Sequence, residues 1–307
     1  MKRLIIILSL AAAICGTPSC SRQEEDSLDP GMGDGRVMVD FTSGLTGQVT
    51  SRASDGNWAD GDRVGIYMKK NGEPLSASSV QLNTNNIEYS VSSSGVMTPV
   101  SRTIYYPNSS HDVDFIAYYP YKSGLEDFIY PVSLYGQGSE GADLADFDLL
   151  YSNNQSGLNR NTSSVELGFS HMLAKVTINL LPGNGTVSGD LQNLNVSFHN
   201  IPAEADFSLI DGSFTVTYTG GPLISELFAS SNSATLFLLP VPHVGSSLII
   251  ARYGEGGLDF AVTWHISDSI VFESGNHYTF DVRINKSSTR SADSFVADGE
   301  LISVEKI

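Results

Sequence analysis

From Arg36 onward the chain consists of short runs of alternating or β-branched residues, separated by turn-forming Gly, Asn, Ser and Pro. An alternation of period two is typical of half-buried strands, and no long stretch repeats with the 3.6-residue period of a helix. Turn signals such as Asp211-Gly212 separate neighbouring runs. Because parallel strands need crossover helices, which this pattern does not supply, we predict an all-β fold built from antiparallel sheets.

The strand runs fall into two groups of about seven, which predicts two tandem β-sandwiches. The polar stretch Ser152–Ser164 separates the groups and contains no run of core positions, so we place the border at its end. We expect an N-terminal sandwich over residues 36–164 and a C-terminal sandwich over residues 165–286. In the second, Val165–Leu181 is expected to form one long buried strand and Leu223–Ala229 a brief helix.

The start of the chain has the pattern of an export signal. A basic beginning precedes the apolar run Leu4–Ile14, which is too short to span a bilayer as a permanent helix, and Cys20 follows a small residue. We expect a signal peptide over residues 1–19 and a lipid anchor on Cys20. The alternative is an ordinary cleaved signal in which Cys20 is incidental. Residues 20–35 are acidic and contain Gly and Pro, which predicts a flexible tether.

The charge of the chain excludes one class of partner. The sequence carries 17 Lys and Arg against 34 Asp and Glu, a formal net charge of -17. Phosphate backbones repel so acidic a chain, so we predict that it does not bind nucleic acid. Its two cysteines, Cys15 and Cys20, both lie in the leader region. The folded part therefore has no disulfide and depends on core burial.

Motifs that carry catalytic chemistry are absent from the sequence, which has no H-E-x-x-H, G-x-S-x-G, P-loop or Rossmann glycine pattern. We therefore predict no catalytic residue, no metal ligand, no cofactor and no enzyme activity. A secreted hydrolase would need two carboxylates paired in a cleft, and no pair stands out. His171 is expected to be structural. Asp143, Asp146 and Asp148 are the weaker alternative of a calcium loop, because the glycine and glutamate of an EF-hand are missing.

Several tyrosines lie close together along the middle of the chain. They are Tyr118, Tyr119, Tyr121, Tyr130 and Tyr135. We expect most of them to pack in or beside a core. The alternative is an exposed aromatic surface that stacks on sugars.

Five motifs, taken together and in this order, resemble the fimbrillin family, the pilin subunits of type V pili. They are Thr50-Ser51-Arg52-Ala53, the run 58–67 (WADGDRVGIY), the run 115–120 (FIAYYP), Asp148-Leu149-Leu150-Tyr151 and the run 169–176 (FSHMLAKV). The resemblance implies Greek-key, transthyretin-like sandwiches and a fimbrial subunit or adhesin at the cell surface. The alternative function is a monomeric surface lipoprotein that binds glycans.

The resemblance also implies a mechanism of assembly. In this family a lipidated precursor at the outer membrane is cut after an arginine by an arginine-specific protease. The cut removes the first strand, and the C-terminal strand of a neighbouring subunit fills the groove. On this chain the resemblance maps the cut between Arg52 and Ala53 and the lost strand to residues 36–49. Arg36 is a second candidate for the cut.

The same resemblance maps the donor strand to the C-terminal tail, residues 287–307, of which 287–293 form a polar hinge. Its donor residues would be Leu301, Ile302, Val304 and Ile307. In a regular strand Ile302 and Val304 share one face, while Leu301 and Ile307 share the other. The partners implied are other pilin subunits, the arginine-specific protease, the outer membrane through the anchor, and host or bacterial surface glycans or proteins.

Overall fold

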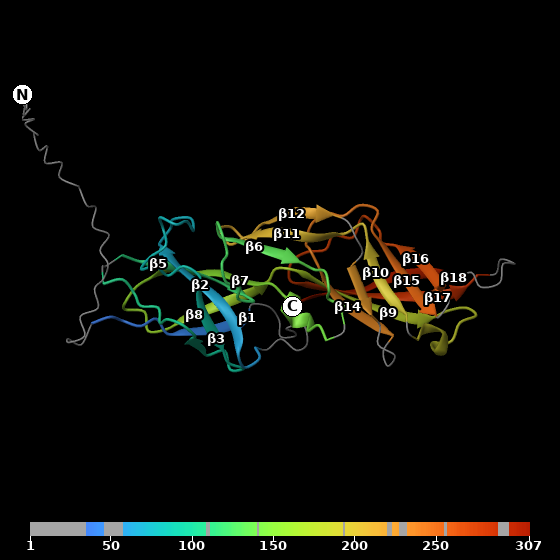
Figure 1. Ribbon diagram of the computed structural model, residues 1–307, viewed down its shortest axis with the longest axis horizontal. Helices are drawn as coiled ribbons and strands as arrows, with labels where there is room; N and C mark the ends of the chain where they lie inside the picture. The colour runs from blue at the N-terminus through green and yellow to red at the C-terminus, as the bar shows by residue number, and fades with distance from the viewer. Residues whose placement is uncertain are drawn as a thin grey trace, which may run out of the picture. The chain divides into compact units, whose positions relative to one another are not determined.

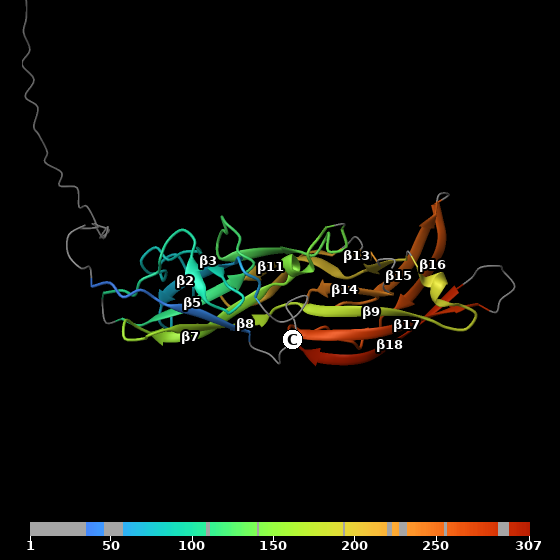
Figure 2. The same ribbon diagram turned by 90° about the horizontal axis from the view of Figure 1, so that it is seen from below.

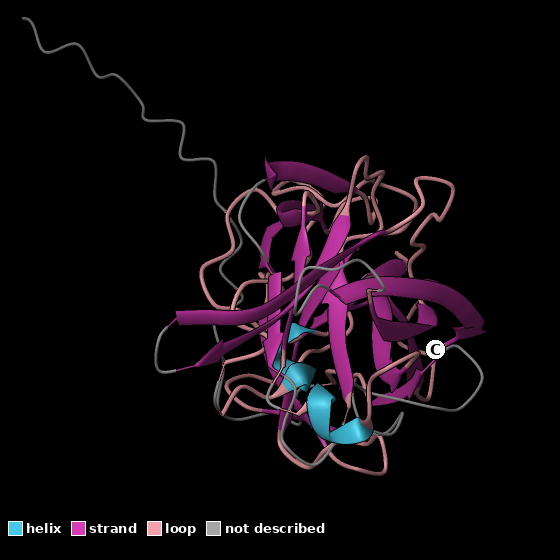
Figure 3. Cartoon of the chain, turned by 90° about the vertical axis from the view of Figure 1, so that its right-hand side faces the viewer, coloured by secondary structure: helices cyan, strands magenta, loops and turns pink. Residues whose placement is uncertain are grey.

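The computed structural model describes residues 35–45, 58–108, 111–139, 141–192, 194–219, 223–226, 232–254, 257–287 and 295–307. The chain divides into two compact units, residues 1–35 and residues 36–307, and the described ranges lie almost entirely in the second. The described residues of that unit form mainly strands, as Figure 3 shows, and two short 3-10 turns. The predicted all-β class is thus confirmed. None of the described helical segments is long and apolar enough to cross a membrane.

The largest sheet of the second unit has seven strands (Figure 1). In spatial order they are β1 (Phe41–Leu45), β8 (Val165–His171), β7 (Leu150–Leu158), β5 (Val113–Tyr119), β2 (Asp62–Lys70), β3 (Ile87–Val91) and β4 (Met97–Pro99). Neighbours in this sheet are antiparallel except β1 and β8, which are parallel.

Three smaller sheets complete the described part of the unit. The first contains β13 (Leu223–Glu226), β10 (Asn195–His199), β15 (Ser247–Gly254) and β16 (Gly257–His265); the second contains β12 (Phe214–Thr219), β11 (Pro202–Ser208) and β6 (Ile129–Ser133); the third contains β14 (Ser233–Leu238), β9 (Ala174–Pro182), β17 (Asn276–Lys286) and β18 (Phe295–Lys306). Only β9 and β17 are parallel among these pairs. The 3-10 turns are η1 (Leu144–Phe147) and η2 (Ser188–Leu191).

Two hydrophobic cores meet at the central strands of the seven-stranded sheet. On β2, Val64, Ile66 and Met68 lie in one core, which we call the first core. Tyr67 points into the other, which we call the second core. The same alternation holds on β5, whose seven residues are all buried. Side chains alternate between the faces of a strand, so one strand supplies both cores. The alternation of the sequence predicts that Val64, Ile66 and Met68 share one face of β2 and that Tyr67 lies on the other, and the two cores confirm this.

Several sequence-based expectations about the strands are wrong. The run Val165–Leu181 is not one strand: it breaks near Met172 into β8 and β9, which lie in different sheets. Pairing with separate neighbours satisfies the backbone on each side of the break, and periodicity alone does not reveal it. The first four residues of the expected helix Leu223–Ala229 form β13, because pairing with β10 outweighs a weak local helix preference.

The polar stretch Ser152–Ser164 is also more than a linker. Its first part belongs to β7, which lies between β5 and β8 and pairs with both. The side chains of Asn153 and Asn154 are exposed, while residues on both sides of them, such as Ser152 and Gln155, pair with β5. A polar segment can therefore belong to a sheet. The domain border at residue 164 stays a prediction, as does the Greek-key topology. The pairing places β8 in the same sheet as β1.

Asp114 on β5 ties the edges of several elements together. Its carboxylate accepts hydrogen bonds from Lys69 Nζ at 2.6 Å and Asn71 Nδ2 at 2.6 Å, and from the backbone N–H groups of Gly72 at 2.9 Å and Gly157 at 3.0 Å. The Asp114 side chain is only 8% exposed. Burial alone would raise the pKa of Asp114, but these donors outweigh it and hold the pKa below its usual value.

Replacing Asp114 with Asn should therefore destabilise the fold in a pH-dependent way. We expect the free energy of unfolding at pH 7 to fall by about 3 kcal/mol, because Lys69 is left partly buried without an anion. A lowered pKa in the folded state stabilises it above the unfolded carboxyl pKa of about 3.9, and that stability is lost as the pH falls through the lower folded value. Denaturant unfolding between pH 2 and 7 tests this, with the exposed Glu126→Gln as control. A difference between wild type and Asp114→Asn that stays constant down to pH 2 would contradict the assignment.

Candidate functional site

The residues predicted to take part in processing and assembly fall into two groups. Cys20, Arg52 and Ala53 lie outside the residues that the structure describes. The predicted donor residues Leu301, Ile302, Val304 and Ile307 lie on or just after β18, within the described range. The first strand β1 is also described. The candidate site is therefore described from the two strands β1 and β18.

The segment leading into β1 and β1 itself are held from both sides. On one side β1 pairs in parallel with β8, from Phe41 opposite Val165 onward. On the other side, the N–H of Val39 donates to the carbonyl of Ile104 at 3.0 Å, and the N–H of Ser43 donates to the carbonyl of Gly95 at 2.8 Å. β1 is thus the last strand in the order of its sheet. Its segment nevertheless has backbone partners on both sides, in β8 on one side and in Gly95 and Ile104 on the other.

The side chains of this segment fill the middle of the first core. Val39 is 3% exposed and Phe41 is 1% exposed. The ring of Phe41 packs edge to face against Phe115, with centroids 5.0 Å apart, and against Tyr89, with centroids 5.5 Å apart. Loss of the segment would uncover these aromatic rings together with the pairing edge of β8.

The tail, which the sequence places after a polar hinge, pairs with a strand of its own chain. β18 forms a long antiparallel pair with β17, from Asn276 opposite Lys306 to Lys286 opposite Phe295 (Figure 2). Beyond the strand, the N–H of Ile307 donates to the carbonyl of Gly275 at 2.9 Å, and Ile307 is buried. β18 is the last strand of its sheet, so its other edge has no strand partner among the described residues.

A bulge in β18 changes which tail side chains share a face. Thr279 pairs with Ser303, while Phe280 pairs with Leu301, which leaves Ile302 as the extra residue. Before the bulge Leu301 lies on the face of Phe280, and beyond it Val304, opposite Tyr278, lies on that same face. The predicted grouping of Ile302 with Val304 therefore does not apply to the tail while it pairs with β17. Alternation alone could not reveal this, because a bulge shifts it by one residue.

Three of the four predicted donor residues are poorly covered in this position, whereas Ile307 is buried. Leu301 is 37% exposed, Ile302 52% and Val304 50%. By contrast, Gly299 lies directly beneath the indole ring of Trp264, where a Cβ atom would come within 2.3 Å of Trp264 Cε2. Gly299 is thus closely packed, whereas Leu301, Ile302 and Val304, like Val296 at 54% in the first half of the tail, leave apolar surface in water.

The residues weighed for other chemistry turn out to be structural. His171 Nδ1 lies 3.0 Å from Asp148 Oδ1, and both side chains are buried. Asp143 caps η1 by accepting a hydrogen bond from the N–H of Ala145. In the described ranges no group of three or more His, Cys, Asp or Glu side chains could hold a metal ion. The calcium alternative therefore gains no support.

The tyrosines are mostly used in the interior, as expected. Tyr118 and Tyr119 are buried, and the other three members of the group are partly buried against the second core. Burial raises the pKa of Tyr130 to about 12. They form no exposed aromatic shelf.

One pocket of about 280 Å³ has a polar lining that includes Tyr151, Asn154 and Asp211. Internal hydrogen bonds already engage its polar groups. Tyr151 donates to the carbonyl of Leu209 at 2.8 Å, and Asp211 accepts from both the N–H and the hydroxyl of Ser213. The pocket therefore offers a sugar few free partners.

Comparison with known proteins places this arrangement in a family. A curated protein of Bacteroides uniformis named "Putative fimbrium subunit Fim1C" is 29% identical over 293 residues, which are 93% of this chain and 92% of that protein. The crystal structure of a "putative cell adhesion protein" from Bacteroides uniformis ATCC 8492 has 26% identity and a TM-score of 0.66, covering 88% of this chain and 98% of that one. A similarly described protein from Bacteroides ovatus ATCC 8483 shares the fold, with a TM-score of 0.67 and 16% identity over 88% and 98% of the two chains. The model of the fimbrillin-like family matches residues 51–298. The chain therefore belongs to the fimbrillin-like family, whose members are fimbrial and cell-adhesion subunits.

Proposed function

We propose that this protein is a cell-surface fimbrial subunit that assembles with other subunits by exchange of terminal strands. Family membership supports the fimbrial role. The observation that carries the exchange is the position of Phe41, a residue near the N-terminal end of the folded unit that is buried between Tyr89 and Phe115. A core that is closed by a terminal edge strand can lose that strand in one cut, and it then needs another strand to replace it.

A cut after Arg52 would allow β1 to be removed in one step. Arg52 follows β1 and precedes Trp58, the first described residue of the next segment. The cut would separate β1, the tether and an anchor on Cys20 from the rest of the chain. Arg36 is a poorer candidate, because a cut there leaves β1 in place, and the carbonyl of the next residue, Val37, accepts a hydrogen bond from Tyr106 at 2.9 Å.

The exposed donor residues supply the driving force for the exchange. Paired with β17, the tail leaves Leu301, Ile302 and Val304 between about a third and a half exposed. A groove vacated by β1 would cover them, and burying each such side chain fully contributes about 1.5 to 3 kcal/mol. Once the tail leaves β17 it can straighten, so that Ile302 and Val304 again share the face directed into the groove.

The remaining parts of the proposal concern the surroundings of the subunit. A signal peptide over residues 1–19 and acylation of Cys20 would deliver the precursor to the outer membrane, where an arginine-specific protease releases it. Adhesion to host or bacterial surface glycans or proteins remains a prediction. Glycan binding by an anchored monomer is the weaker alternative, because the tyrosines are largely packed inside.

The cleavage site can be tested by replacing Arg52 with Gln. We expect this variant to keep β1 after treatment with an arginine-specific protease, and to form no ladder on a denaturing gel run without boiling. The control Arg36→Gln should assemble like wild type. Mass spectrometry of the treated proteins identifies the new N-terminus. A ladder of normal intensity from Arg52→Gln would contradict the proposed cut.

The donor role can be tested with charges in the tail. The double substitution Ile302→Asp and Val304→Asp should weaken assembly about a hundredfold or more, because two apolar side chains would no longer enter the groove. The double substitution Val244→Asp and Val271→Asp is the matched control, since both side chains are exposed (79% and 62%) and neither belongs to the tail. Both double variants should keep the melting temperature of the precursor, because all four side chains are about half or more in water there. Equal ladders from the double variant in the tail and from wild type would exclude the tail as donor.

The anchor can be tested by cell fractionation. Cys20→Ala should move the precursor from the membrane fraction to the soluble fraction, because each buried methylene of an acyl chain contributes about 0.8 kcal/mol to membrane retention. Cys15→Ala is the control and should remain in the membrane fraction. Labelling with a fatty-acid analogue that marks Cys20→Ala as strongly as wild type would show that Cys20 is not the acylated residue.

A further inference from the structure

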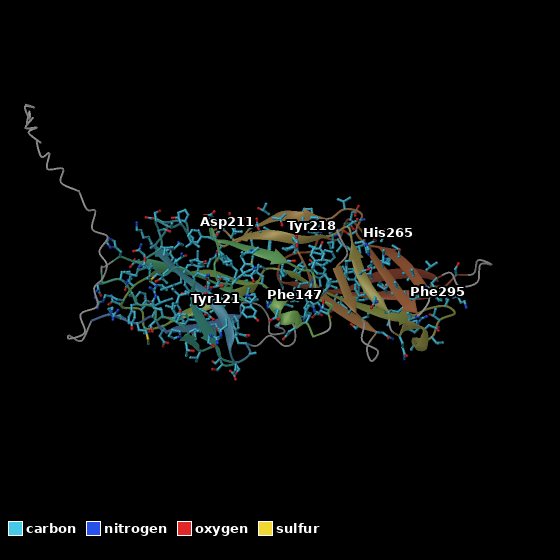
Figure 4. All side chains as sticks on the ribbon, viewed as in Figure 1. Tyr121, Phe147, Asp211, Tyr218, His265 and Phe295 are labelled. Atoms are coloured by element: carbon cyan, nitrogen blue, oxygen red, sulfur yellow. The ribbon has the colours of Figure 1, made fainter. Side chains whose placement is uncertain are left out.

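The tail makes one contact outside its own sheet that is unlike the rest of its pairing. Trp264 belongs to β16, the last strand of the sheet β13-β10-β15-β16, whereas Gly299 belongs to β18, the last strand of another sheet. The ring atoms of Trp264 occupy the space where a side chain at Gly299 would lie. Figure 4 labels His265 and Phe295, which mark the end of β16 and the beginning of β18. The indole thus joins the edge strands of two sheets across the tail.

The indole ring of Trp264 also packs against β17 and the second core. Trp264 packs against Phe280 on β17, with ring centroids 5.5 Å apart, and it lies against the second hydrophobic core. Ala297 and Phe295 of the tail pack against that core as well. An aromatic ring over a glycine on a neighbouring strand covers backbone that the glycine leaves bare. Phe295, Ala297 and Gly299 therefore hold one side of the tail, while Val296 between them is 54% exposed. This packed side, which we call the clamp, ends just before the bulge at Ile302.

We infer that the packing of Trp264 on Gly299 is a latch that holds the tail against β17 until a partner is available. This inference rests on the proposed function, and it adds a contact that regulates when the tail can leave β17. The clamp, which is the packed side of residues 295–299, retains the tail, whereas the half from Leu301 onward carries the side chains that would enter a partner. Trp264 acts as a positioning residue: it sets how often the tail leaves β17, and it does not itself enter the groove.

The latch makes a specific prediction about two substitutions and their combination. Trp264→Ala removes the ring, and Gly299→Ala places a methyl group where the ring lies. Each alone should loosen the tail. In the Trp264→Ala background, however, Gly299→Ala should loosen it no further, because the atoms that the methyl group would meet are gone. Such non-additivity is expected only where two residues act through one contact.

Hydrogen exchange of the full-length precursor, in which β1 is still in place, measures tail release without assembly. We expect amide protection over residues 295–306 to fall at least tenfold in Trp264→Ala and in Gly299→Ala, with the double variant no lower than Trp264→Ala. Trp264→Phe should lie between wild type and Trp264→Ala. Protection of β2 and β5 serves as the internal control that the fold is intact. Unchanged protection of the tail in both single variants, or strictly additive effects in the double variant, would overturn the latch.

Assembly after protease treatment then separates the latch from the proposed function. If the latch controls donation, the single variants should form ladders at least several-fold faster than wild type. A looser tail with no change in assembly rate would contradict the latch as a control of donation. A looser tail in a protein that never assembles, wild type included, would contradict strand exchange itself and leave the release measurements standing.

Discussion

The packing of Phe41 between Tyr89 and Phe115 is the interaction on which the rest of the structure depends. It places a residue from the first strand at the centre of the first core, so that the core is complete only while that strand is present. Because the backbone around β1 bonds both to β8 and to residues 95 and 104, the strand also completes the hydrogen bonding of its neighbours. An edge strand with this position is easy to remove and costly to leave unreplaced.

The tail differs from β1, because its backbone is paired while several of its apolar side chains are exposed. β18 pairs with β17 along its length except at the bulge residue Ile302, yet Ile302 and Val304 remain about half exposed. A groove without a strand and a strand with uncovered side chains would complement each other. In the exchange that we propose, a strand donated by another subunit would relieve both together, without an external source of energy. In the proposed latch, the contact of Trp264 with Gly299 keeps the tail in place before that moment.

The sequence predicts those features of the fold that depend on alternation, and it misses those that depend on the partner of a strand. The alternation around Ile66 placed the faces of β2 correctly, because side chains in a strand point alternately to its two faces. The polar strand β7 was missed because its backbone pairing leaves no trace in polar side chains. The break near Met172 and the bulge at Ile302 were missed because both are set by neighbouring strands. For the candidate site, the sequence located the tail but did not show that it pairs with β17.

The most direct test of the central claim is to measure binding of the tail as a free peptide. A labelled peptide of residues 294–307 would be titrated into protein cleaved after Arg52 and freed of its N-terminal fragment, below the concentration at which it assembles, and into the uncleaved precursor. Saturable binding to the cleaved protein alone, with a rise in its melting temperature, is the predicted result. Equal binding to both forms, or no binding to the cleaved form, would contradict the account.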